Sequence, residues 1–265
     1  MYNGEKTVEE SGATTLFLVR HGETIDNARQ IMQGQTQGCL NERGREQAQQ
    51  VAQRLADEPF DAVVASDLHR AIQTAEIIAA PHGLPVSTTP LLRERDWGSF
   101  TGRFIPDLKG EVWPDDIESE QALLQRAADF LQYMTATYPG KRVVAVGHGI
   151  INKAILSVYA GCTMREVQRM MNAEVRLLTV SAERTATSAS AAMAATAAAA
   201  SAETSSRSAA AGTTTTAFAD RATAVVHCGS CRTGTWSTRV VWAMAIRAKV
   251  SDSAVVFTRV PLVTQ

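Results

Sequence analysis

The stretch Leu16-Phe17-Leu18-Val19-Arg20-His21-Gly22-Glu23-Thr24 decides how the rest of the sequence is interpreted. Its four leading apolar residues are typical of a buried β-strand. An arginine and a histidine follow directly, so both are expected at the carboxyl end of that strand, where open α/β sheets bind their ligands. The Arg20 guanidinium suits phosphate or carboxylate. The His21 imidazole can act as a nucleophile, a proton carrier or a metal ligand.

An alternation of short apolar runs and amphipathic stretches predicts the fold. Further strands are expected at residues 62–65, 143–146 and 175–180, with a weaker one near Val86. Helices are expected over residues 42–57, 68–80, 118–137 and 150–160. Strands that alternate with helices favour a parallel sheet. We therefore expect an α/β fold, a three-layer sandwich with a mostly parallel central sheet flanked by helices, plus a low-complexity C-terminal tail.

The alternating pattern defines one domain, residues 14–182, which would carry the catalytic site. Residues 1–13 form a polar N-terminal extension. Residues 183–221 are rich in Ala, Thr and Ser and are expected to be disordered or a weak, solvated helix. From residue 184 to about residue 217 the sequence is almost entirely these three residue types, with little that would dock a helix. Residues 222–265 form an atypical C-terminal segment that does not complete the α/β pattern.

The composition of the 265-residue chain limits its partners and location. A formal net charge of −1 gives no general attraction to nucleic acid or anionic membranes, so any anion site must be local. No apolar run is long enough to span a bilayer. The four cysteines are too sparse for a disulfide scaffold. We expect a cytoplasmic protein without nucleic-acid or membrane partners; its oligomeric state is left open, with a homodimer as one possibility.

Four polar clusters each follow a strand-like run. They are Arg20-His21, residues 66–70, residues 93–96 and Gly147-His148-Gly149. The carboxyl ends of parallel strands share one edge of a sheet, so these clusters should converge although they are far apart in sequence.

This combination of residues is suited to phosphoryl transfer, which depends on positioning and on stabilising negative charge. Arg20 and Arg70 can clamp the phosphate oxygens bidentately, and a protonated His148 would add a third charged donor. His21 must present an unprotonated nitrogen to phosphorus, and neighbouring cations favour its neutral form. Glu94 can protonate the leaving group and then take a proton from water.

Two of the clusters allow another interpretation. Residues 93–96 could form a surface salt-bridge network, and Asp96 is the alternative acid if Glu94 is misplaced. Residues 227–231, His-Cys-Gly-Ser-Cys, could be half of a zinc site, but no second Cys/His pair lies nearby in the sequence. A metal site is therefore not expected.

The sequence resembles the histidine phosphatase superfamily, also called phosphoglycerate mutase-like. The resemblance covers residues 14–180 and rests on five motifs in the family's order, namely Leu18 to Thr24 with Asn27, Gln33 to Thr36 with Leu40 to Gly44, Ala65 to Glu76, Leu92 to Glu94 with Gly98 and Gly102, and Val146 to Gly149. After Asn172 the chain departs from the family, because the Ala/Thr/Ser tract stands where a hairpin and a final segment are usual.

The resemblance implies that His21 is the phosphorylated nucleophile and that Glu94 is the proton donor. It places Arg20, Asn27, Gln33, Gly34, Arg70 and His148 around the substrate phosphate. No metal and no cofactor are implied, and the partner is a small phosphorylated metabolite.

Three functions remain open. Only residues 104–116 separate the Glu94 loop from the long helix. In and next to this segment, the two basic residues Arg103 and Lys109 are outnumbered by acidic residues. This short, weakly basic cap is more similar to a phosphatase than to a phosphoglycerate mutase. The alternatives are mutase-type phosphoryl transfer and a phosphate-binding module without turnover.

Overall fold

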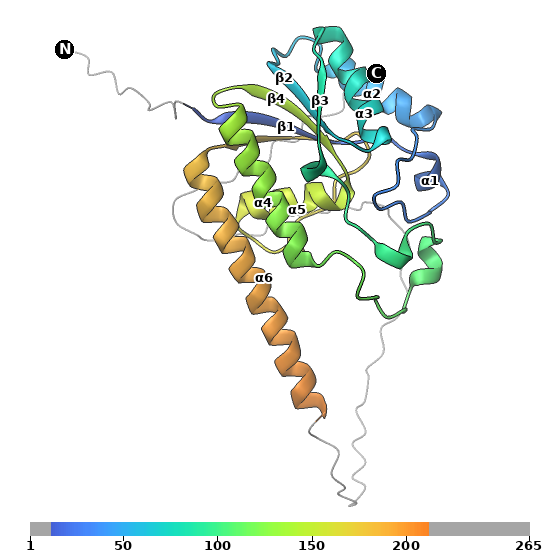
Figure 1. Ribbon diagram of the computed structural model, residues 1–265, viewed down its shortest axis with the longest axis vertical. Helices are drawn as coiled ribbons and strands as arrows, with labels where there is room; N and C mark the ends of the chain where they lie inside the picture. The colour runs from blue at the N-terminus through green and yellow to red at the C-terminus, as the bar shows by residue number, and fades with distance from the viewer. Residues whose placement is uncertain (1–11, 212–265) are drawn as a thin grey trace, which may run out of the picture. The chain divides into compact units, whose positions relative to one another are not determined.

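The computed structural model describes residues 12–211, and within them five strands form one sheet. The strand order is β3 (Val86–Thr89), β2 (Ala62–Ser66), β4 (Arg142–Gly147), β1 (Thr14–Arg20) and β5 (Val175–Val180). The first four are parallel, and β5 pairs antiparallel with β1. The predicted α/β class with a mostly parallel sheet is confirmed (Figure 1).

The described helices are α1 (Ile25–Ala28), α2 (Glu42–Arg54), α3 (His69–Ala79), α4 (Glu120–Thr137), α5 (Gly149–Ala160) and α6 (Ala182–Ala211). Four of them, α2 to α5, connect the strands where the sequence pattern predicts helices, whereas α1 was not predicted and α6 follows the last strand. Short 3₁₀ turns at Ala80–His82, Pro90–Leu92, Gly98–Phe100 and Ile105–Leu108 were not predicted. Of the helices in residues 12–211, none is both long and apolar enough to cross a membrane.

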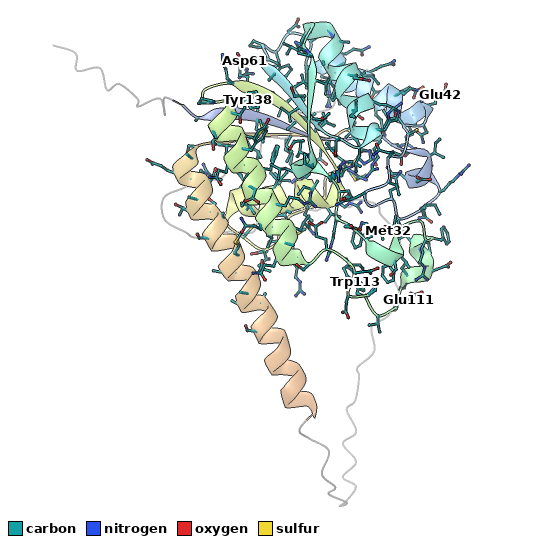
Figure 2. All side chains as sticks on the ribbon, in the orientation of Figure 1. Met32, Glu42, Asp61, Glu111, Trp113 and Tyr138 are labelled. Carbon is teal, nitrogen blue, oxygen red and sulfur yellow. The ribbon has the colours of Figure 1, made fainter. Side chains whose placement is uncertain are left out.

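Alternate residues of each strand build two cores, one on either face of the sheet. Leu16 and Leu18 of β1 pack with α4 and α5, whereas Phe17 and Val19 pack with α2 and α3. Successive side chains of a strand point to opposite faces of the sheet. A strand that is buried on both faces therefore needs apolar residues at successive positions, as β1 has from Leu16 to Val19. The connecting segment that bears Met32 and the cap segment that bears Trp113 lie together at one end of the molecule, away from Asp61, which directly precedes β2 (Figure 2).

A close backbone contact positions the loop after β1. A Cβ on Gly22 would lie 2.3 Å from the Gly44 carbonyl oxygen, and a Cβ on Gly44 would lie 2.0 Å from the Glu23 carbonyl oxygen. Only glycine fits at both positions. The first turn of α2, which the Asn41 side chain caps, is thereby packed directly against the loop that carries His21.

The Ala/Thr/Ser tract was expected to be disordered or a weak, solvated helix; where the structure describes it, the tract is a helix that docks on the core. Residues 182–211 form the helix α6, and Ala192 in its first half is fully buried. Ala189 and Met193 pack on the same core cluster as α4 and α5. Alanine favours helix, and its small side chain lets α6 approach closely. Met193 supplies a larger apolar contact, which was not expected from the composition of the tract.

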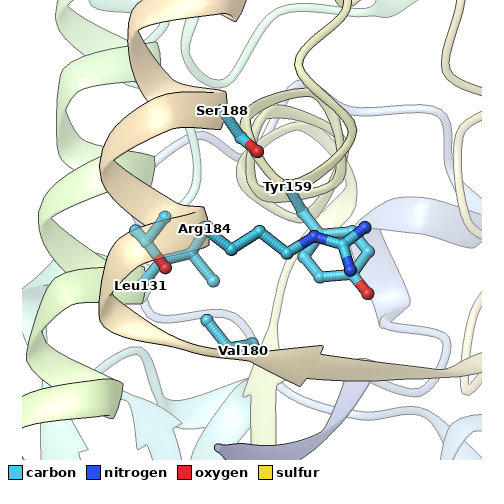
Figure 3. A pocket seen from close by; sticks show the side chains of 6 residues that line it. Leu131, Tyr159, Val180, Arg184 and Ser188 are labelled. Carbon is cyan, nitrogen blue, oxygen red and sulfur yellow. The ribbon is translucent and has the colours of Figure 1, made fainter. Parts of the chain in front are cut away.

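A second contact fixes the start of α6. Figure 3 shows the Arg184 side chain lying against Tyr159 of α5, with its guanidinium carbon 4.7 Å from the centre of the ring. Leu131 of α4, Val180 of β5 and Ser188 surround them. The predictions for residues 1–11 and 212–265, including the candidate zinc ligands at 227–231, lie outside the described residues.

Candidate functional site

A cavity of about 200 Å³ opens where the parallel strands end. It is lined by Arg20, His21, Asn27, Ile31, Met32, Gln33, Gly34, Arg70, Glu94, Trp97, Ile105, Ile150 and Arg169. Seven of the eight residues singled out from the sequence are among them. The eighth, His148, does not line the open volume, but its ring centre lies 5.0 Å from that of His21.

The His21 ring is held in one orientation by the backbone. His21 follows β1, and its amide donates to the Gly147 carbonyl at the end of β4. Its Nδ1 lies 2.7 Å from the Gly22 carbonyl oxygen, which can only accept a hydrogen bond, so the proton is assigned to Nδ1. Burial, followed by the charges of Arg70 and Arg20, lowers the pKa of His21 well below 6.5. His21 is therefore neutral, with its lone pair on Nε2.

His148 directly follows β4 and is the N-cap residue of α5, where it is fully buried. Arg70 Nε donates to its Nδ1 at 3.2 Å, which places the ring proton on Nε2. Among the described residues, this Nε2 has no hydrogen-bond partner. Burial and then the charge of Arg70 lower the pKa of His148 well below 6.5. In the empty site the His148 ring therefore offers one neutral N–H donor and not the charged donor that a protonated ring would supply.

Arg20 keeps two donors available. Its Nη1 donates to the Met170 carbonyl at 2.8 Å. Its Nε is buried without a partner, and no hydrogen bond within residues 12–211 uses its Nη2. Nε and Nη2 form one edge of the guanidinium, the arrangement that binds two oxygens of a phosphate or carboxylate. Burial, then the charge of Arg169, lowers the pKa of Arg20 to about 10, so it stays cationic near neutral pH.

Arg70 does not form the bidentate phosphate clamp that its sequence position predicts. Its side chain is almost completely buried, and it donates to His148 and to the carbonyl oxygens of Thr36, Gln37 and Gly34. A guanidinium has five N–H groups, so one remains for a ligand. Arg70 therefore holds the loop at residues 34–37 in place and cannot clamp two phosphate oxygens in this arrangement.

The Glu94 carboxylate lies at the amino end of α5. It accepts hydrogen bonds from the backbone amides of Arg95, Ile150 and Ile151, at 2.9 to 3.2 Å. These contacts fix the carboxylate at the cavity wall. Asp96, the alternative acid, is exposed, does not line the cavity and accepts from the Gly98 amide. Of the two, only Glu94 is placed to act on a ligand in the cavity.

Asn27 and Gln33 lie on the wall between the His21 loop and the cap, bonded to each other. Asn27 Nδ2 donates to Gln33 Oε1 at 3.2 Å, and Asn27 also completes a capping box with Thr24. Gln33 Nε2 donates to Asp26. Their positions are thus defined by local capping and by this pair.

Arg169 lines the cavity although the sequence motifs do not point to it. It lies in the coil between α5 and β5 and is exposed at the cavity. The direction of β5 explains why Arg169 reaches the cavity. Because β5 runs antiparallel, its first residue, Val175, pairs with Val19 near the end of β1. The segment before β5 therefore reaches the same edge of the sheet as the carboxyl ends of the parallel strands.

The outer wall of the cavity is apolar. Ile31, Met32, Trp97 and Ile105 form it. The Arg95 guanidinium packs against the rings of both Trp97 and Trp113, 5.0 and 5.1 Å from their centres. The two rings also contact each other, with centres 5.6 Å apart, and this cluster holds the cap together. Within residues 12–211, no group of three or more His, Cys, Asp or Glu side chains is arranged to hold a metal ion.

Comparisons with known proteins identify the family of this chain. The histidine phosphatase superfamily (branch 1) model matches residues 16–192, two thirds of the chain. This chain belongs to the histidine phosphatase superfamily. The family resemblance noted from the sequence motifs is thereby confirmed, and its match extends into the first part of α6.

Similar members of the superfamily are named as phosphatases and as mutases. The chain is 36% identical to the uncharacterized phosphatase PhoE of Bacillus subtilis over 152 residues, covering 56% of this chain and 78% of the relative. It is 34% identical to the probable phosphoglycerate mutase GpmB of Erwinia tasmaniensis over 169 residues, covering 58% and 79%.

Solved structures give the same result. A mycobacterial glucosyl-3-phosphoglycerate phosphatase superposes with a TM-score of 0.58 at 27% identity, covering 63% of this chain and 90% of that one. The alpha-ribazole phosphatase of Shigella flexneri gives 0.56 at 27% identity, covering 62% and 89%. Histidine phosphatase relatives therefore include both phosphatases and mutase-like proteins, and they support an enzyme.

Proposed function

We propose that this histidine phosphatase is a metal-independent phosphomonoesterase that acts through a phosphohistidine at His21. The observation that carries the proposal is the neutral His21 ring, whose Nδ1 is tied to the Gly22 carbonyl and whose Nε2 is left with its lone pair. Around it lie the free edge of Arg20, the last N–H of Arg70 and the unpartnered N–H of His148. These donors suit the oxygens of a transferring phosphoryl group.

In the first step, His21 Nε2 attacks phosphorus while the bond from phosphorus to the ester oxygen breaks. Glu94, in its protonated form, gives its proton to the departing oxygen, and the alcohol leaves. In the second step, water attacks the phosphohistidine and passes a proton to the Glu94 carboxylate. The P–N bond breaks, inorganic phosphate is released and neutral His21 is restored.

The size of the cavity supports a small substrate. Its volume of about 200 Å³ is below the roughly 300–1,000 Å³ typical of drug-sized ligands. A phosphorylated metabolite with one small leaving group fits this limit, and the apolar wall around Trp97 would contact its carbon skeleton.

Mutase activity is the second candidate, because relatives named as phosphoglycerate mutases align with the chain. The state of the cap favours the phosphatase. Arg103, a basic residue of that region, is paired bidentately with Glu111, at 2.7 and 2.5 Å. It is therefore not available to hold a second phosphate group during transfer between two hydroxyls.

Hydrolysis of phenyl phosphate by the full chain in excess EDTA tests the proposal. Wild-type protein should release phosphate, His21→Ala should be inactive, and His69→Ala, a change at an exposed histidine, should match wild type. Isomerisation of a phosphoglycerate that outpaces phosphate release would establish the mutase instead. Equal activity of wild type and His21→Ala would exclude His21 as the nucleophile, and binding of phosphate without turnover would indicate a non-catalytic module.

A further inference from the structure

The Arg169 guanidinium is a cation at the cavity without a partner in the described part of the chain. No hydrogen bond or ion pair within residues 12–211 uses it, although Glu174 lies five positions along the same segment. The Glu174 carboxylate is occupied by Arg176 and by the Met171 amide. Arg169 is thus free to bind a ligand.

The backbone of α5 leaves space for Arg169 at this position. A Cβ on Gly149 would lie 2.7 Å from Arg169 Nε and 2.8 Å from its Nη2. The guanidinium is therefore packed against the first turn of α5, next to Ile150, which also lines the cavity. Any larger residue at position 149 would displace it from this place.

The charge of Arg169 acts on Arg20 and His21 in the empty site. After burial, it is the largest cause that lowers the pKa of Arg20, and it also lowers that of His21. The charges of Glu94 and Glu174 offset part of this repulsion. Neither carboxylate forms an ion pair with Arg169 within residues 12–211, so the Arg169 guanidinium can take an anionic group of a ligand. The transferred phosphate already has donors in Arg20, Arg70 and His148. Arg169 is therefore available to bind a different anionic group of the substrate.

We propose that Arg169 binds a second anionic group, a carboxylate or a second phosphate, on the leaving group of the substrate. Arg169 is then a specificity-determining residue, and the preferred substrates are phosphomonoesters that carry this additional negative charge. The inference rests on the proposed phosphomonoesterase function, which supplies the position of the first phosphate.

Three aryl phosphates of similar shape separate the two anionic groups. Phenyl phosphate has no second anion, 3-carboxyphenyl phosphate carries a carboxylate, and 1,3-phenylene bisphosphate carries a phosphate. The full-length wild type, Arg169→Met and Arg169→Lys are compared by kcat/KM on each. Arg54→Met, which removes an arginine from the last turn of α2, is the matched control for the loss of one positive charge.

The wild type should prefer one or both of the anionic substrates over phenyl phosphate. Arg169→Met should reduce that preference about tenfold, the value of one charge-assisted contact, while changing phenyl phosphate less than about twofold. Arg169→Lys should keep part of the preference, and Arg54→Met all of it. The substrate that loses most identifies the anion. An equal loss on all three substrates would overturn the proposal, because Arg169 would then act on the transferred phosphate, and so would no loss on any of them.

Failure of the proposed function is recognised separately, because wild-type protein would then not hydrolyse phenyl phosphate at all. Titration calorimetry with phenylphosphonate, 3-carboxyphenylphosphonate and 1,3-phenylenebisphosphonate, which cannot be hydrolysed, then decides the inference. Arg169→Met should weaken binding of at least one of the two ligands that carry a second anion about tenfold relative to phenylphosphonate. Unchanged relative affinities would overturn it.

Discussion

Acidification should destabilise the folded protein through the two buried histidines of the site. His21 and His148 are both neutral in the fold, because burial and the charges of Arg70 and Arg20 lower each pKa well below 6.5. In the unfolded chain both rings regain their ordinary pKa. Near and below that value the unfolded chain binds more protons than the folded protein. The free energy of unfolding therefore decreases as the pH falls.

The magnitude follows from this difference in bound protons. With an unfolded pKa of about 6.5, one histidine that stays neutral in the fold costs about 1–2 kcal/mol between about pH 7.5 and about pH 5.5. The two histidines together therefore remove about 3 kcal/mol from the free energy of unfolding. Both rings are almost fully inaccessible to solvent, so screening does not reduce this value greatly.

Urea unfolding at the two pH values measures the effect, in buffers without phosphate, because a bound phosphate dianion would favour protonation of the site. The double variant His21→Gln and His148→Gln should lose about 3 kcal/mol less than wild type over the same interval, since glutamine does not titrate. His69→Gln, at an exposed position, should behave like wild type. If the double variant and the wild type lose the same stability, the buried rings do not bind protons as described.

Three further predictions concern single contacts. Arg20→Lys, which loses the paired Nε and Nη2 donors, should lower kcat/KM for phenyl phosphate about 100-fold with little loss of stability, as unfolding curves run in parallel will show. Wild-type activity in this variant would refute the clamp. Gly44→Ala should lower the free energy of unfolding by about 1–3 kcal/mol, because its Cβ meets the Glu23 carbonyl; an unchanged urea midpoint would contradict this contact. Ala192→Asp should destabilise by more than about 2 kcal/mol, since it buries a charge, whereas Ala194→Asp at an exposed position of α6 should not; similar midpoints for both would show that α6 does not dock on the core.

The parts of the fold that depend on strong periodicity could be predicted from the sequence. The strand at Val175–Val180 has the predicted bounds, and the helix at Glu120–Thr137 begins two residues after its predicted start. Both contain large apolar residues at the spacing of their element. The helix α6 could not be predicted in this way, because its contact is made by alanines and by Met193. Small side chains give little hydrophobic signal although they pack closely.

The site shows the same limit for side chains. Convergence of the four polar clusters follows from the parallel sheet, which the strand and helix pattern of the sequence predicts. The sequence could not predict that Arg20 keeps free donors for a ligand while Arg70 holds a loop. The carbonyl groups that accept hydrogen bonds from Arg70 belong to the irregular segment at residues 34–37. Arg169 was missed because it follows no strand and instead precedes β5. The apolar pattern of Val175–Val180 predicts a strand there but does not show that this strand runs antiparallel to its neighbour.

The phosphorylated residue itself can be identified by mixing the full-length protein with phenyl phosphate, quenching in alkali on the millisecond scale and mapping the modified peptide by mass spectrometry. Alkali is needed because a phosphohistidine is lost in acid. A phosphoryl group on His21 that forms at least as fast as phosphate is released, and that is absent in His21→Gln, is the predicted result. Steady hydrolysis with His21 unmodified, or with the phosphoryl group on another residue, would contradict it.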